Sequence, residues 1–76
     1  MSPDRTSVLL LLGATIAEHR HSLGISQEEL AERAGLHRTY IGSLERGRRN
    51  PTVTTLSSVA RGLACSASDL LAEASL

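Results

Sequence analysis

Apolar residues recur along this chain every three or four positions, in five segments separated by residues that begin or end helices. This period places apolar side chains on one face of a helix, and the strict alternation typical of half-buried strands does not occur. The sequence therefore predicts an all-α fold, a compact five-helix domain that covers residues 1–76. The expected helices span residues 3–23, 27–34, 38–46, 53–63 and 67–74.

Hydroxyl residues and glycines mark the expected helix ends. The predicted N-caps are Ser2, Ser26, Thr52 and Ser66. Pro3 fits the first helical position, and Ser26 and Ser66 are each followed by a carboxylate three residues later, as in a capping box. The predicted stops are Gly24, Gly35 and Gly47, because glycine accepts the left-handed conformation that closes a helix.

The length of 76 residues limits the size of the core, and chains this small commonly rely on a disulfide, a metal or a partner subunit. The single cysteine, Cys65, excludes an intrachain disulfide and is expected to be a small buried hydrophobe. His19 and His21 are two residues apart, so they point to different helix faces and are expected to be solvated.

No arrangement of residues indicates catalysis or a bound cofactor. The sequence has no Cys/His ligand spacing, no glycine-rich phosphate loop and no nucleophile with a recognisable base. It therefore predicts no enzyme, no metal, no cofactor and no small-molecule ligand. The apolar run 8–12 is far shorter than the ~20 residues that span a bilayer and lacks a cleavage pattern, so we expect a cytoplasmic protein without membrane contact.

Charge is distributed unevenly, although the formal net charge is zero. Four arginines lie within residues 38–49 and are opposed there only by Glu45, whereas three of the eight acidic residues gather at 28–32. A neutral protein with one basic strip can bind DNA through that strip.

Residues 26–47 combine a helix, a glycine, a short connection and a second helix, which is typical of a helix-turn-helix unit. Ile41 and Leu44 are expected to hold the second helix against the core. The opposite face then carries small or polar residues: Arg38, Thr39, Gly42, Ser43 and Arg46. Such a face fits a major groove about 12 Å wide, although an ordinary solvated helix is the alternative.

Several segments of this region resemble the phage-repressor and Cro-like helix-turn-helix family: 26–31, 34–36, 40–41, 44–47 and Pro51. The resemblance extends over about residues 12–71 and implies a lambda-repressor-like fold and a transcriptional regulator that binds double-stranded DNA. The segments 38–41, 45–46 and 49–50 most resemble controller proteins of restriction–modification systems, which implies a palindromic operator and a dimer. His37 departs from that pattern, because an acidic residue is common there.

The resemblance also implies residue roles. The base-reading residues would be Arg38, Thr39 and Ser43. The DNA-backbone contacts would be Gln27, His37, Tyr40, Arg46, Arg48, Arg49, Asn50 and Thr52. Three alternatives stay open: Arg49 reaching the minor groove or the dyad, His37 serving as an N-cap or base reader, and the Tyr40 ring packing against the core.

Two further expectations concern stability and assembly. The family places an interhelical ion pair at the positions of Arg20 and Glu45, and the alternative is two unrelated surface charges. Four late leucines exceed what one small core can cover, which favours a homodimer through residues 52–75 over a monomer with a looser core: Leu63, Leu70, Leu71 and Leu76.

Two other kinds of protein compete with a regulator. One is a protein-binding module of the antitoxin type, and the other is a structural domain of a larger protein. The first is disfavoured because only two residues follow the last expected helix, and the second because Met1 and capped ends suggest a complete domain. A methyltransferase and a nuclease encoded beside this chain would support the controller hypothesis, and a toxin gene the antitoxin hypothesis.

Overall fold

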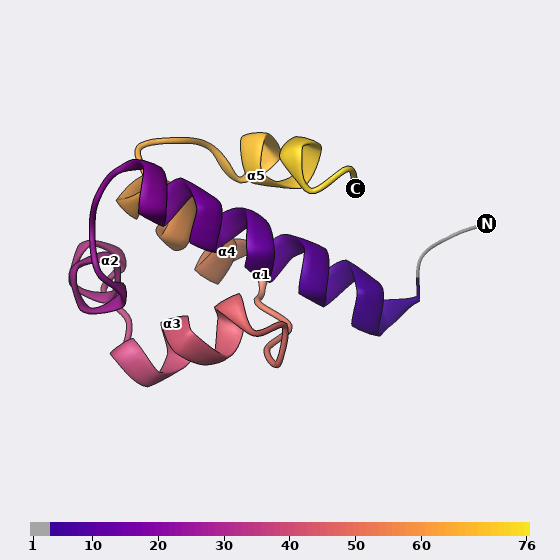
Figure 1. Ribbon diagram of the computed structural model, residues 1–76, viewed down its shortest axis with the longest axis horizontal. Coiled ribbons are helices and arrows are strands. Elements are labelled where there is room, and N and C mark those ends of the chain that lie inside the picture. The colour runs from indigo at the N-terminus through magenta and orange to yellow at the C-terminus, as the bar shows by residue number, and fades with distance from the viewer. Residues whose placement is uncertain (1–3) are drawn as a thin grey trace.

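Five helices make up the computed structural model, which describes residues 4–76 (Figure 1). They are α1 (Arg5–Ser22), α2 (Gln27–Ala34), α3 (Arg38–Glu45), α4 (Val53–Gly62) and α5 (Ala67–Glu73). The long α1 lies between α5 on one side and α3 on the other, and α4 packs against both α2 and α5. The all-α, five-helix prediction is confirmed, with each helix boundary close to its expected position.

The core forms where the apolar faces of all five helices meet. Its fully enclosed side chains come from every helix: Ile16, Leu30, Ile41, Leu44, Val59 and Leu70. Ile41 and Leu44 are buried as expected, which fixes α3 in one rotational setting about its own axis. Leu23, the last residue of the first expected helix, is the C-cap of α1 and is exposed.

The helix starts agree with the sequence in part. Ser2 and Pro3 lie outside the described residues, and α1 has Asp4 as its N-cap, whose carboxylate accepts a hydrogen bond from the Ser7 amide at 2.8 Å. The Ser26 hydroxyl caps α2 through the Glu29 amide, but the Glu29 side chain does not complete the capping box and lies near Arg33 instead. At α5 the capping box of the same type is complete.

The helix stops are confirmed. Gly24, Gly35 and Gly47 have φ angles of 70°, 69° and 74°. A side chain in this left-handed region is strained, so glycine is favoured at all three positions.

Two of the four leucines assigned to a dimer interface belong to the core of this one chain instead. Leu63 and Leu70 are 3% and 0% exposed, because α5 folds back over α1 and α4 and covers them. Their assignment to an interface was therefore wrong. Leu71 and Leu76 are 38% and 42% exposed, so they remain available to a partner.

The contact between α1 and α5 also corrects the prediction for His19. Its imidazole Nε2 contacts the Glu73 carboxylate, so His19 is partly covered and not simply solvated. Cys65 is half-buried nearby, and burial together with the negative charges of Asp69 and Glu73 raises the pKa of its thiol. A raised pKa reduces the thiolate fraction, which agrees with a packing role for this side chain.

Gly13, for which the sequence predicts no role, sets the distance between α1 and α3. An ideal Cβ on Gly13 would lie 2.5 Å from the carbonyl oxygen of Leu44 and 2.6 Å from that of Glu45. Both atoms belong to the backbone of α3, so the two helices approach closely only because residue 13 has no side chain. Gly13 therefore helps to position the C-terminal end of α3.

Residues 4–76 contain no helix long and apolar enough to cross a membrane. The same residues hold no pocket and no group of three or more potential metal ligands.

Candidate nucleic-acid interface

The turn between α2 and α3 positions α3 on an outer face of the molecule (Figure 1). Gly35 adopts the left-handed conformation, and the Leu36 amide donates back to the Ala31 carbonyl at 2.9 Å, which closes α2. His37 then begins α3 with extended backbone. Because Ile41 and Leu44 are buried, the first turn of α3 presents Arg38 and Thr39 to solvent.

The middle of α3 differs from the expected exposed face. Gly42 is buried although it was assigned to the outward side, and Ser43 is half-buried. The Gln27 side chain of α2 and the Arg46 side chain lie over Gly42, with Gln27 Oε1 and Arg46 Nη1 at 3.5 and 3.3 Å from where a Cβ would stand. Gly42 is therefore covered by side chains of this chain itself.

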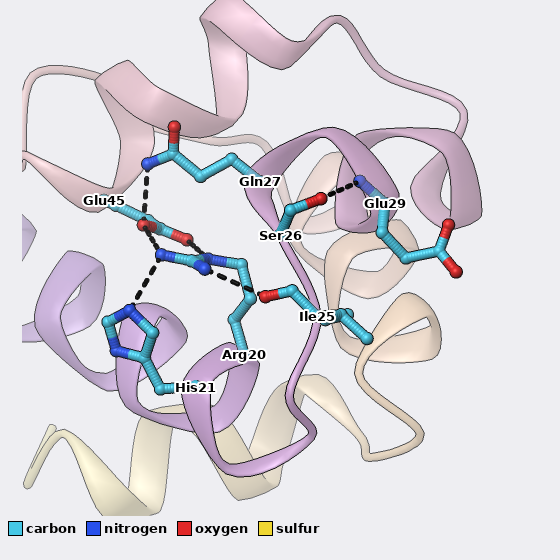
Figure 2. A network of polar contacts seen from close by, with 7 residues as sticks. All are labelled: Arg20, His21, Ile25, Ser26, Gln27, Glu29 and Glu45. Carbon is cyan, nitrogen blue, oxygen red and sulfur yellow. Dashed lines mark hydrogen bonds and ion pairs between the residues drawn. The ribbon is translucent and has the colours of Figure 1, made fainter.

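The ion pair that was expected between α1 and α3 is present (Figure 2). Arg20 donates from Nε to Glu45 Oε2 at 2.7 Å and from Nη2 to Oε1 at 3.0 Å, and these side chains are 10% and 7% exposed. The bond to Glu45 raises the pKa of the Arg20 guanidinium, which stays charged. Arg20 also donates to the Ile25 carbonyl and contacts His21.

Gln27 connects this pair to α2. Its Nε2 donates to Glu45 Oε1 at 3.0 Å, so the Glu45 carboxylate bonds to side chains from two other helices (Figure 2). Charge-assisted, two-pronged bonds of this kind fix direction as well as distance. The network therefore anchors the C-terminal end of α3 to both α1 and α2.

The remaining residues that were predicted to contact DNA lie along α3 and in the loop after it. His37 is exposed and its side chain makes no capping bond. Tyr40 packs partly against the core, and the Arg49 guanidinium lies 5.6 Å from the centre of its ring. Arg48 and Asn50 are exposed in the loop.

Thr52 has a structural role of its own. Its hydroxyl caps α4 by accepting from the Thr55 amide and donates its proton to Thr55 Oγ1. Because the Thr52 hydroxyl already donates its proton to Thr55, the assignment of Thr52 as a donor to phosphate is weakened.

The structure thus brings the predicted residues into two groups. Arg38 and Thr39 stand at the exposed start of α3, whereas Gln27 and Arg46 lie over Gly42 and Arg46 bonds to Ser43. The second group was missed as a group, although the i, i+3 spacing of Ser43 and Arg46 on one helix was a signal for it. An exposed, arginine-bearing helix beside the N-terminus of a second helix defines a DNA-binding helix-turn-helix domain.

Comparison with known proteins supports this class. Residues 16–70 match the family model described as helix-turn-helix. A control protein from Serratia marcescens, C.SmaI, is 48% identical over 61 residues, which cover 80% of this chain and 73% of that protein. An uncharacterised HTH-type transcriptional regulator from Sinorhizobium fredii, y4dJ, is 46% identical over 61 residues, covering 80% and 79%.

A solved structure supports the same class of protein. The restriction–modification controller protein C.AhdI from Aeromonas hydrophila superposes with a TM-score of 0.80 at 37% identity, over 82% of this chain and 94% of that one. This chain belongs to the helix-turn-helix family of the phage-repressor and Cro-like type. It is a DNA-binding transcriptional regulator, and its family is non-enzymatic.

Proposed function

We propose that this chain is a controller-type regulator that binds a palindromic operator as a homodimer. The observation that carries the proposal is the exposed first turn of α3, with Arg38 and Thr39 on a helix held by the Arg20–Glu45–Gln27 network. Residues 26–47 form the DNA-binding unit and residues 52–75 the dimerisation region. The similarity to C.SmaI and C.AhdI, both described as controller proteins, supports the same assignment.

Within this proposal, the residues divide into base contacts and backbone contacts. Arg38 bonds guanine O6 and N7, the Thr39 methyl group touches a thymine methyl, and Ser43 lies one turn further along. The phosphate contacts come from the rest of the predicted set without Thr52, whose hydroxyl proton is donated to Thr55: Gln27, His37, Tyr40, Arg46, Arg48, Arg49 and Asn50. Arg49 already lies over the Tyr40 ring, which holds its guanidinium close to the C-terminal loop of α3.

Arg38→Ala and Arg49→Ala are expected to weaken DNA binding in different ways. Loss of a bidentate base contact costs about 1–3 kcal/mol per half-site and removes preference at one base pair. Loss of a phosphate contact weakens binding to all sequences and lowers the salt slope by about one unit. The measurement is a titration of both variants against the operator and a panel of single-base variants at several salt concentrations.

The wild-type chain titrated against DNA upstream of its own gene supplies the reference. Arg38→Ala should retain residual nonspecific binding, and Arg49→Ala should retain most of the base preference. An Arg38→Ala variant with the full wild-type base preference would show that α3 does not contact bases as proposed.

A homodimer is expected at tens of micromolar in sedimentation. Its two α3 helices would lie about one DNA turn apart, ~34 Å. Since Leu63 and Leu70 are buried, Leu71 and Leu76 are the leucines of the dimerisation region that can contact a partner. Leu71→Asp should sediment as a folded monomer.

Leu23→Asp is the matched control for this experiment, because Leu23 is 44% exposed but lies at the end of α1, outside residues 52–75. It should sediment like the wild type. A wild-type chain that remains monomeric with and without DNA would contradict the homodimer.

A further inference from the structure

One polar contact fastens α5 to the helix beside it, α1 (Figure 1). Within residues 4–76, the only side-chain hydrogen bond or ion pair that joins α5 to another helix is that of the His19 imidazole with the Glu73 carboxylate. The other hydrogen bonds of α5 side chains stay within residues 66–69. The rest of the attachment is apolar and centres on the buried Leu70.

The helix α5 depends on this attachment. It has seven residues, and a helix this short is not stable in water by itself. A short element of this kind opens more easily than the core of a domain. Opening would uncover Leu70 and displace Leu71 and Leu76, the exposed leucines of the dimerisation region. The position of α5 therefore decides whether that surface exists.

The groups of α5 that face His19 are acidic. Glu73 contacts the imidazole, and Asp69 lies one turn earlier on the same helix. The pKa of Asp69 is lowered, chiefly by its hydrogen bonds to Ser66 and to a smaller extent by the charge of His19. The Cys65 thiol adds no charge, because burial and the same two carboxylates raise its pKa.

The other charged groups near His19 are occupied elsewhere or exposed. On α3, which also packs against α1, the Glu45 carboxylate is bonded to Arg20. On α1 itself, Glu18 is exposed and His21 contacts Arg20. No arginine within residues 4–76 pairs with either α5 carboxylate. His19 is therefore the cation available to α5.

The charge of the imidazole sets the strength of this contact. Histidine ordinarily changes its charge between pH 5 and 8, a range in which carboxylates are ionised. A charged imidazole forms a stronger hydrogen bond to Glu73 than a neutral one does. Asp69 and Glu73 are four residues apart on one helix, so they repel each other, and a cation beside them offsets this repulsion.

We propose that His19 and Glu73 form a proton-dependent clamp that holds α5 against α1 and thereby controls the surface that α5 presents to a second copy of this chain. The clamp stabilises α5 at mildly acidic pH, and this contribution is lost as the pH rises and the imidazole loses its proton. It is lost again in stronger acid, where Glu73 takes up a proton. The control of a second copy rests on the homodimer proposed above, whereas the clamp is a property of the single chain.

Native-state hydrogen exchange measures the opening of α5 directly. The amides of Leu70 and Ala74 are bonded to carbonyls of residues 66 and 70, so they exchange when α5 opens. Their protection relative to the Leu30 amide of α2 should rise from about pH 8 to about pH 6, after correction for the intrinsic exchange rate. The rise should be on the order of threefold, because the side chains of the pair are 24% and 55% exposed.

Three variants assign this response to the clamp. His19→Gln keeps a neutral donor that cannot gain a charge, and Glu73→Gln removes the carboxylate. In both, the protection of α5 should no longer change with pH. His37→Gln is the matched control, because His37 is exposed and its side chain makes no capping bond. It should keep the wild-type response.

Sedimentation equilibrium at the same two pH values tests the control of a second copy. Both protomers need a closed α5, so the apparent association constant of the dimer scales with the square of the closed fraction. A closed fraction that falls by half therefore weakens the dimer about fourfold. The wild type should associate more weakly at the higher pH, and His19→Gln should associate equally at both.

The two measurements fail in different ways. A wild-type α5 whose protection does not change with pH, or a change that persists in His19→Gln, would overturn the clamp. A wild type that dimerises equally at both pH values while its α5 responds would overturn the control of the second copy. A wild type that is monomeric at both would overturn the homodimer and that control together, and the exchange measurement would still decide the clamp.

Discussion

Glu45→Gln is expected to lower the free energy of unfolding by about 3–5 kcal/mol, because it removes one partner of a buried ion pair. The Arg20 guanidinium would remain enclosed opposite a neutral amide, and the Gln27 amide would lose its carboxylate acceptor. A chain of 76 residues typically has only about 4–11 kcal/mol of stability in total. The variant should therefore be largely unfolded well below the wild-type melting temperature.

Urea or thermal denaturation followed by circular dichroism measures this effect. Glu29→Gln is the matched control, because Glu29 pairs with Arg33 at 3.5 Å on the surface and is 44% exposed. An exposed pair of this kind contributes about 0–1 kcal/mol. If Glu45→Gln unfolds within a degree or two of Glu29→Gln, the buried pair does not anchor α3 to α1.

Gly13→Ala is expected to destabilise the fold by about 1–3 kcal/mol or more, the range found when atoms are forced into a packed interior. The added methyl group would lie within 2.6 Å of two carbonyl oxygens of α3, and these cannot rotate away as side chains can. To accept it, α1 and α3 must separate, which also stretches the Arg20–Glu45 contact. Thermal denaturation of the variant provides the measurement.

The same substitution at Gly42 controls for the effect of alanine itself. Alanine stabilises a helix interior by about 0.5–1 kcal/mol relative to glycine, so Gly42→Ala should melt at or above the wild-type temperature. A Gly13→Ala variant that is as stable as Gly42→Ala would show that the two helices are not held by this close contact.

The local features of this fold could be predicted from the sequence, because they depend on neighbours within one or two turns. The glycine stops and the Ile41 and Leu44 anchors of α3 are such features, and the structure confirms them. The helix-turn-helix unit followed from their order along the chain.

Features that depend on distant residues were missed, apart from the Arg20–Glu45 ion pair, which the family resemblance implied. Gly13 meets α3 more than thirty residues later, and His19 contacts Glu73 across a separation of 54 residues. A count of late leucines also could not show that α5 folds back over the core and encloses Leu63 and Leu70. These contacts are set by how the helices pack, which no local pattern encodes.

The division of α3 into a buried side and an exposed first turn has a consequence for how such regulators diversify. Arg38 and Thr39 lie away from the core, and surface substitutions of this kind usually change stability by no more than about 0.5 kcal/mol. Under the proposed base contacts, exchanging these two positions one at a time would change the preferred operator at little cost in stability. The Gln27 and Arg46 side chains lie over Gly42, and Arg46 bonds to Ser43, so these positions are expected to evolve together. Retargeting this scaffold in the laboratory should begin with the first pair.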